Sequence, residues 1–183
     1  YGAATQLSIP EQAFNLSSSA NSNLDFSELA LQFQAGLLAW FNNQEDLQAA
    51  KNLAVCCSQI GSKNQDDSSR KVFWVASVLL QAVANGQLKL SNALRNSIVK
   101  IDKEVDYINN RIVGEVRKSS PARLTQELLY FVAQNYKSSD DLRQVYEVFE
   151  LEHNIPNASE IEHARSSLLG RNNALLQSVS AVI

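Results

Sequence analysis

The sequence predicts an all-α fold, a helical bundle of about seven helices. Two runs, residues 70–84 and 128–133, have helical composition and are apolar on most of their circumference. A helix that is apolar nearly all round has to be enclosed by other elements, so each run is expected at the centre of the bundle. The sequence shows no sustained alternation of apolar and polar residues and no Asn-Gly or Asp-Gly hairpin signal, since Asn85-Gly86 ends a helical run, so no strand is expected.

Residues 1–23 are expected to form a flexible N-terminal linker, and residues 24–183 a single helical bundle domain. The linker contains Pro10 and a run of small polar residues over 17–23, a composition that buries little apolar surface. A chain of 183 residues has the size of one domain. Because the chain begins at Tyr1 and contains no Met, we expect it to be a piece of a longer protein.

The first helix is expected to start at Asp25 and to end at Asn42-Asn43. A second apolar stripe, of Leu24, Leu31 and Leu38, predicts that this helix contacts neighbours on two sides. The stripe expected to face the core has the three-four spacing of a helix and consists of Phe26, Leu29, Ala30, Phe33, Leu37, Trp40 and Phe41.

The second and third helices are expected on either side of a polar loop. One is expected over residues 45–60, ended by Gly61 and followed by a polar loop over residues 62–69. The apolar helix then runs to Asn85-Gly86, a typical C-terminal stop.

The fourth helix is the most clearly amphipathic of the chain. Ser91 is expected to cap it, and Lys100 and Glu104 are expected to pair on its exposed face, four residues apart. Its apolar stripe consists of Leu90, Leu94, Ile98, Ile101, Val105, Ile108 and Ile112.

Three more helices complete the prediction. Ser120-Pro121 has the order of cap and first helical residue that starts a fifth helix. Residues 140–149 form a short sixth helix with Leu142, Val145, Tyr146 and Phe149 inward. The capping-box pattern at residues 157–160 starts a last helix over residues 159–178.

Charge, hydropathy and cysteine use narrow the function classes. Lys and Arg number 16 against 19 Asp and Glu, which gives a net charge of −3, and they form no basic stripe, so no nucleic-acid partner is expected. No apolar run approaches the roughly 20 residues that cross a bilayer, so no membrane insertion is expected, and no signal peptide is recognisable. Cys56 and Cys57 are adjacent on a helix, where side chains diverge by about 100°. They are therefore expected to be buried structural thiols, which is consistent with a cytoplasmic protein.

No catalytic, cofactor-binding or metal-ligating residue is expected. The acidic pairs at 45–46, 66–67 and 140–141 lie at expected helix starts or in a loop, where a helix N-terminus favours negative charge. His153 is expected to be an exposed loop residue. His163, early in the last helix, is the candidate for a phosphoacceptor, but the basic Arg165 lies on a different helix face, and a solvated surface histidine is the favoured interpretation.

One polar stripe interrupts the apolar central helix, and it consists of Arg70, Ser77, Gln81 and Asn85. Trp74 borders this stripe, so it is the aromatic residue expected to reach a groove or a partner. The chain's aromatic pairs are otherwise expected in the core: Trp40 and Phe41, Phe73 and Trp74, and Tyr130 and Phe131.

A family resemblance rests on five segments in a fixed order. They are residues 33–40 (FQAGLLAW), 72–76 (VFWVA), 92–108, 124–133 and 142–148 (LRQVYEV). This order is similar to the N-terminal region of the chemotaxis-type hybrid histidine kinases PilL and ChpA and to the related FimL scaffold protein of bacterial type IV pilus systems. The similarity covers about residues 28–150 and rests mainly on packing residues. Residues 72–74 hold one aromatic residue fewer than the commoner pattern of this family.

The resemblance implies a degenerate phosphotransfer-like bundle with extra helices, acting as a cytoplasmic scaffold in a chemosensory pathway for pilus assembly and twitching motility. Protein partners, such as a CheY-type response regulator, are implied in the same way. The residues themselves leave two alternatives open. One is an active histidine phosphotransfer module that uses His163, and the other is a small all-α enzyme with a cleft along Ser77 and Gln81.

Overall fold

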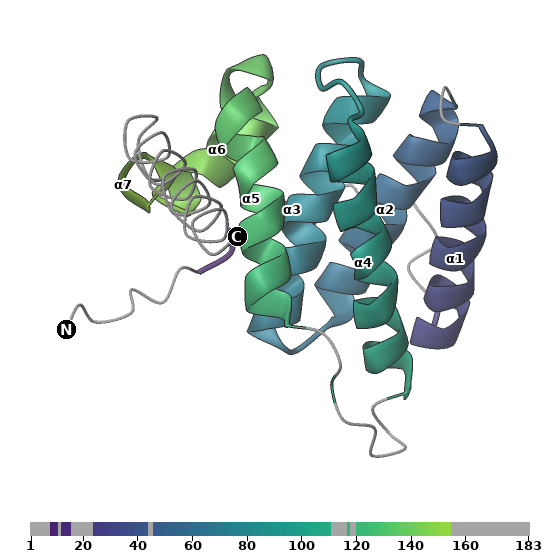
Figure 1. Ribbon diagram of the computed structural model, residues 1–183. Helices are drawn as coiled ribbons and strands as arrows, with labels where there is room; N and C mark the ends of the chain where they lie inside the picture. The colour runs from purple at the N-terminus through teal and green to yellow at the C-terminus, as the bar shows by residue number, and fades with distance from the viewer. Residues whose placement is uncertain are drawn as a thin grey trace, which may run out of the picture. The chain divides into compact units, whose positions relative to one another are not determined.

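The computed structural model describes residues 8–10, 12–15, 24–43, 46–110, 117 and 120–154, and within them all regular structure is helical, which confirms the all-α prediction. The chain divides into two compact units, residues 1–149 and 150–183. The described helices are α1 (Phe26–Asn42), α2 (Leu47–Lys63), α3 (Asp67–Ala84), α4 (Asn92–Asn110), α5 (Pro121–Asn135), the 3₁₀ helix η3 (Tyr136–Ser138), α6 (Asp140–Val148) and α7 (Leu151–Asn154), drawn in Figure 1.

The starts of the helices are set locally, by side chains that cap free backbone N–H groups. Asp25 accepts a hydrogen bond from the backbone of Glu28, whose side chain bonds back to Asp25, a complete capping box. Ser120 caps α5 ahead of Pro121, as the sequence predicts. Ser91 accepts from the backbone N–H of Leu94 at 3.1 Å and so caps α4.

Helix α3 is the centre of unit 1 and contacts α2, α4, α5 and α6. In Figure 1 it lies behind α4 and α5 and beside α2. Every side chain from Val72 to Leu80 is buried. The ring of Trp74 stacks on Phe149 with centroids 5.9 Å apart, which ties α3 to the end of α6. The prediction of a central apolar helix is therefore confirmed.

The junction of α2 and α3 differs from the prediction of a helix end at Gly61 and a loop over residues 62–69. Helix α2 continues to Lys63, α3 already starts at Asp67, and only residues 64–66 connect them. Gly61 is buried inside α2 and lies against the ring of Phe14. The glycine therefore makes room for an aromatic ring and does not end the helix. Phe14 belongs to a 3₁₀ turn over residues 12–15, within the stretch expected to be a linker.

The C-terminal part of the described chain contains one further difference. His153, expected in a loop, lies in the short helix α7, and its side chain is exposed. The expected helix over residues 159–178 and its His163 lie outside the described residues, and the single bundle domain expected over residues 24–183 stays a prediction. None of the helices in the described ranges combines the length and the hydropathy that a membrane crossing requires.

Candidate interaction site

The outer face of α1 carries two exposed leucines. Leu31 is 67% exposed and Leu38 is 64% exposed. They are seven residues apart and thus separated by two helical turns, about 10 Å, with the exposed Ala35 between them. The prediction that this stripe contacts a second neighbour is therefore wrong for Leu31 and Leu38. Helix α1 does contact two helices, α2 and α4, but through its other faces.

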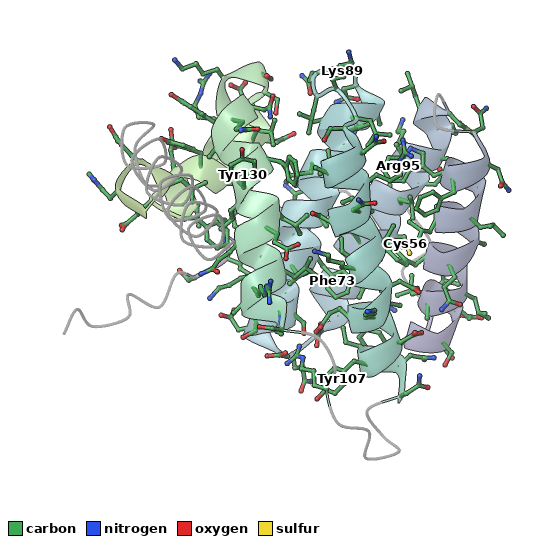
Figure 2. All side chains as sticks on the ribbon, in the orientation of Figure 1. Cys56, Phe73, Lys89, Arg95, Tyr107 and Tyr130 are labelled. Carbon is green, nitrogen blue, oxygen red and sulfur yellow. The ribbon has the colours of Figure 1, made fainter. Side chains whose placement is uncertain are left out.

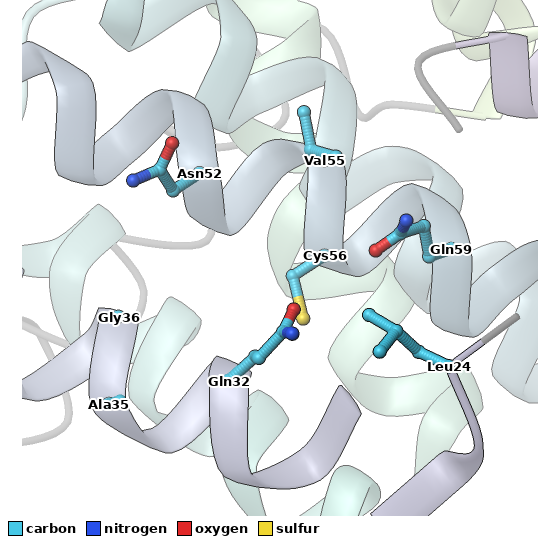
Figure 3. A pocket seen from close by; sticks show the side chains of 8 residues that line it. All are labelled: Leu24, Gln32, Ala35, Gly36, Asn52, Val55, Cys56 and Gln59. Atoms are coloured by element: carbon cyan, nitrogen blue, oxygen red, sulfur yellow. The ribbon is translucent and has the colours of Figure 1, made fainter. Parts of the chain in front are cut away.

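A groove opens beside this stripe, between α1 and α2, with a volume of about 560 Å³. Figure 3 shows Gln32 from α1 and Cys56 from α2 pointing toward one another across it, with Leu24 and Gln59 at one end. Ala35 belongs both to the leucine stripe and to the lining of the groove. The complete lining is Leu24, Gln32, Ala35, Gly36, Asn52, Val55, Cys56 and Gln59.

The described side chains that line the groove are uncharged, and three of them carry amides. Gln32, Asn52 and Gln59 each carry an amide that can both donate and accept hydrogen bonds, and the described lining contains no Asp, Glu, Lys or Arg. Gly36 lets α1 approach α2 closely, since a Cβ there would come within 3.1 Å of Leu53 Cδ2. Amides next to apolar side chains suit a peptide or a helix of another protein, whose polar backbone and apolar side chains both need partners.

Cys56, which lines this groove, and the adjacent Cys57 are structural groups. Both are free and buried, as predicted. Burial raises the pKa of Cys56 to about 12 and raises that of Cys57 well above its ordinary value, because a thiolate loses hydration there. The Cys56 thiol donates to the backbone oxygen of Leu29 at 3.3 Å. Thiols held in the neutral form are poor nucleophiles.

The predicted polar stripe of α3 lies partly in a second, smaller cavity of about 240 Å³. Ser77 and Gln81 line it together with Trp74, so Trp74 does reach a groove although its side chain is almost entirely buried. The Ser77 hydroxyl donates to the backbone oxygen of Trp74 at 2.7 Å. Asp141 is the one ionisable side chain among the described lining residues. The Ser77 hydroxyl thus donates to a backbone oxygen, whereas a nucleophile–base pair requires donation to a basic side chain.

An ion cluster around the buried Glu104 joins the start of α3, α4 and Arg117, which precedes α5. Glu104 is fully buried in α4 and pairs with the guanidinium of Arg117. Arg117 also pairs with Asp66 at 3.0 Å and lies over the ring of Tyr107, 4.7 Å from its centroid. The prediction that Lys100 pairs with Glu104 on an exposed face is wrong, because Lys100 reaches Glu127 of α5 instead, at 2.6 Å.

Two pKa shifts follow from this cluster. Although partial burial acts to raise it, the hydrogen bonds from Ser69 and Arg117 hold the pKa of Asp66 below its ordinary value. Although desolvation acts to lower it, the hydrogen bond and charge of Glu104, with those of Asp66, raise the pKa of Arg117. Both shifts favour the charged forms of Asp66 and Arg117, and the cluster links the start of α3 to α4.

Of the six aromatic residues predicted in the core, Trp40, Phe73 and Trp74 are buried, and Phe41 and Phe131 are half-buried. The prediction is wrong for Tyr130, which is 52% exposed on α5 (Figure 2) and meets Phe131 edge to face. Among the described residues, no three His, Cys, Asp or Glu side chains are grouped closely enough to hold a metal ion. The phosphoacceptor candidate His163 lies outside the described part of the chain.

The sequence did not identify the exposed stripe and the groove as a site. One signal was present: α1 has more apolar residues than one core-facing stripe needs, and the excess is Leu31 and Leu38. From the sequence alone, this excess predicts a second buried contact of α1. The partner of Glu104 could not be found by spacing, since Arg117 is 13 residues away and beyond the end of α4.

One of the comparisons with known proteins identifies a family. A family model described as FimL scaffold protein second domain matches residues 19–162, which include helices α1 to α7. Searches among curated proteins and among solved structures found no match. The resemblance to the FimL scaffold protein is thereby confirmed, over a range wider than residues 28–150.

Proposed function

This chain belongs to the FimL scaffold protein second-domain family, and we propose that it is a non-catalytic helical docking module. Its pathway would be the bacterial chemosensory system that controls type IV pilus assembly and twitching motility, and its location the cytoplasm. The fold would be a degenerate version of a phosphotransfer bundle with extra helices. The family supports the scaffold role, and the finer assignment is our proposal.

One observation carries the proposal, namely the exposed Leu31–Leu38 stripe of α1 next to the uncharged groove between α1 and α2. Covering two exposed leucines on one helix face removes apolar surface from water, which lowers the free energy of the complex. Amide side chains at the edge of the groove supply hydrogen bonds to a partner backbone. We propose a helix of a CheY-type response regulator as the partner segment.

The experiment is calorimetric titration of a purified CheY-type regulator into this chain. We expect saturable binding that is weakened about tenfold or more in the double variant Leu31→Glu/Leu38→Glu, because a buried charge opposes apolar docking. Tyr130→Glu, an exposed apolar residue on α5, is the matched control and should change affinity less than about twofold.

The outcomes separate the alternatives. Equal weakening by the α1 variant and the Tyr130→Glu control would contradict the proposed face, and no binding would contradict the proposed partner. The same chain is also incubated with the phosphorylated regulator. Acid-labile label that disappears in His163→Gln would replace the docking module with an active phosphotransfer module.

A further inference from the structure

The N-terminal 3₁₀ turn places one aromatic side chain in a socket on α2 and α3. Phe14 is buried, although it precedes the first helix and lies outside the range matched by the family. Its ring lies against Gly61 of α2, and the guanidinium of Arg70 from α3 lies 5.6 Å from the ring centroid. The turn therefore contacts residues 47 and 56 positions further along the chain (61 minus 14 and 70 minus 14).

The Phe14 ring explains why residue 61 is a glycine. A Cβ at residue 61 would come within 2.8 Å of Phe14 Cζ and closer still to Cε1, and all three nearest atoms belong to Phe14. Glycine inside a helix is unfavourable relative to alanine. Helix α2 nevertheless runs through Gly61 to Lys63. The glycine thus leaves a space in the helix surface that is shaped for an aromatic ring.

The groove around the turn is larger than the turn that lies in it. A cavity of about 240 Å³ remains between residues 12–15 and the helices α3 and α6. Amide and hydroxyl groups face this cavity from both helices, among them Ser77, Gln81 and Gln144. These groups can bind the backbone of a segment longer than the present turn.

We propose that this groove is a binding site for a phenylalanine-bearing peptide turn, and that the turn over residues 12–15 occupies it as a tethered ligand. A segment of a partner protein with the same chemistry would compete for the socket. Arg70 contributes selectivity for an aromatic ring through its cation–π contact. Because the ligand is part of the same chain, its effective concentration is high, and an outside segment binds well only after the turn has left.

The site shares no lining residue with the docking groove proposed above: both involve α2, but this one uses Gly61, α3 and α6 and not the outer face of α1. The two proposals can therefore fail separately. The present inference concerns a peptide ligand whose sequence the chain itself provides, Ser8–Leu16 (SIPEQAFNL).

The test is fluorescence polarisation with a labelled peptide of this sequence and the full chain carrying Phe14→Ala, which empties the socket. We expect saturable binding below about 1 mM, and weaker binding to the unaltered chain, whose own turn competes. A peptide with alanine in place of phenylalanine should bind roughly tenfold more weakly or worse, because the buried ring is its main anchor.

A second substitution in the emptied chain closes the socket without removing any contact. Gly61→Ala adds one methyl group where the ring lay, and alanine favours the helix, so the variant Phe14→Ala/Gly61→Ala is expected to fold. It should lower peptide affinity roughly tenfold or more. Ser62→Ala, at the exposed next position of α2, is the matched control and should leave the affinity unchanged.

Three results would overturn the inference. They are no saturable binding to the Phe14→Ala chain, equal affinity of the Gly61→Ala and Ser62→Ala variants, and equal affinity of the unaltered and Phe14→Ala chains. Circular dichroism of every variant shows whether the helices are retained, so a loss of binding can be separated from a loss of fold.

Discussion

Glu104 is a carboxylate with no exposed surface, and such a group is stable only when its charge is compensated. The compensation comes from Arg117 and from the Ser69 hydroxyl, which lies 2.5 Å from Glu104 Oε1. The same hydroxyl lies 2.8 Å from Asp66 Oδ2, so its single proton is donated to one of the two carboxylates at a time. The cluster therefore connects the first turn of α3 to the middle of α4 and to the segment before α5 (Figure 2 labels Tyr107 nearby).

Arg117→Ala should lower the free energy of unfolding by about 2–4 kcal/mol, since the buried Glu104 loses its cation. The value lies below that of a fully enclosed pair, because the Arg117 side chain is itself partly exposed. Urea denaturation near neutral pH measures the change.

Arg123→Ala is the control for this substitution. Its side chain is 82% exposed and 3.7 Å from Glu127, so its removal should change stability by about 0.5 kcal/mol or less. Equal effects of the two arginine substitutions would show that the buried cluster contributes no more than a surface pair.

The lowered pKa of Asp66 predicts an acid-dependent part of the stability. The carboxyl has a folded-state pKa below its ordinary value of 3.8, so the unfolded chain binds its proton more readily. The resulting stabilisation is present above pH 3.8 and is lost as the pH falls through the folded-state pKa. Asp66→Asn keeps a capping side chain. Its free energy of unfolding should therefore lie further below that of the wild type at about pH 6 than at about pH 2.5.

Denaturation of both proteins at the two pH values measures this difference. Asp46→Asn, a substitution at the N-cap of α2, is the control for loss of a capping carboxylate. A gap between wild type and Asp66→Asn that is the same at both pH values would contradict the assigned shift.

Helix α1 carries leucines on two faces, one buried and one exposed. Leu29 is completely buried, whereas Leu31 is mostly exposed, two residues further along the same helix. Leu29→Ala should lower the free energy of unfolding by about 2–4 kcal/mol, because it leaves a cavity in the core.

The free energy of unfolding of Leu31→Ala should stay within about 0.5 kcal/mol of that of the wild type, because the substitution removes atoms that are in water. Thermal and urea unfolding of the two variants provide the comparison. A loss of more than about 1 kcal/mol in Leu31→Ala would mean that the outer face of α1 is covered in solution by another part of the chain or by a second copy.

Helix boundaries followed from the sequence where a local signal sets them, and did not where a distant residue does. Asp25, Ser91 and Ser120 mark helix starts correctly, because capping is a contact between residues two or three positions apart. The end of α2 was misplaced, since Gly61 looks like a helix stop in the sequence and is explained only by the ring of Phe14.

For the whole of unit 1, the position of α3 among four other helices determines where stability is concentrated. The amides of α3 should exchange with deuterium more slowly than those of α1, because opening α3 requires separation of the core. Hydrogen-exchange mass spectrometry at neutral pH measures this order. Protection of α1 equal to or greater than that of α3 would contradict the central role of α3.

The helical class, the central helix, most helix starts and the burial of Cys56 and Cys57 follow from the amino-acid sequence. These features depend on composition, periodicity and contacts between near neighbours, all of which a single chain displays directly. The family followed from the resemblance of five segments to known sequences.

The tertiary structure alone decided which apolar face stays exposed and which charges meet. Leu31 and Leu38 have the spacing of buried residues, yet no described helix covers them. Glu104 has a lysine four residues before it, yet Arg117 compensates it. Phe14 is buried because α2 and α3 come together around a glycine. Each outcome depends on how helices distant in sequence pack together, and periodicity along one helix does not contain that information.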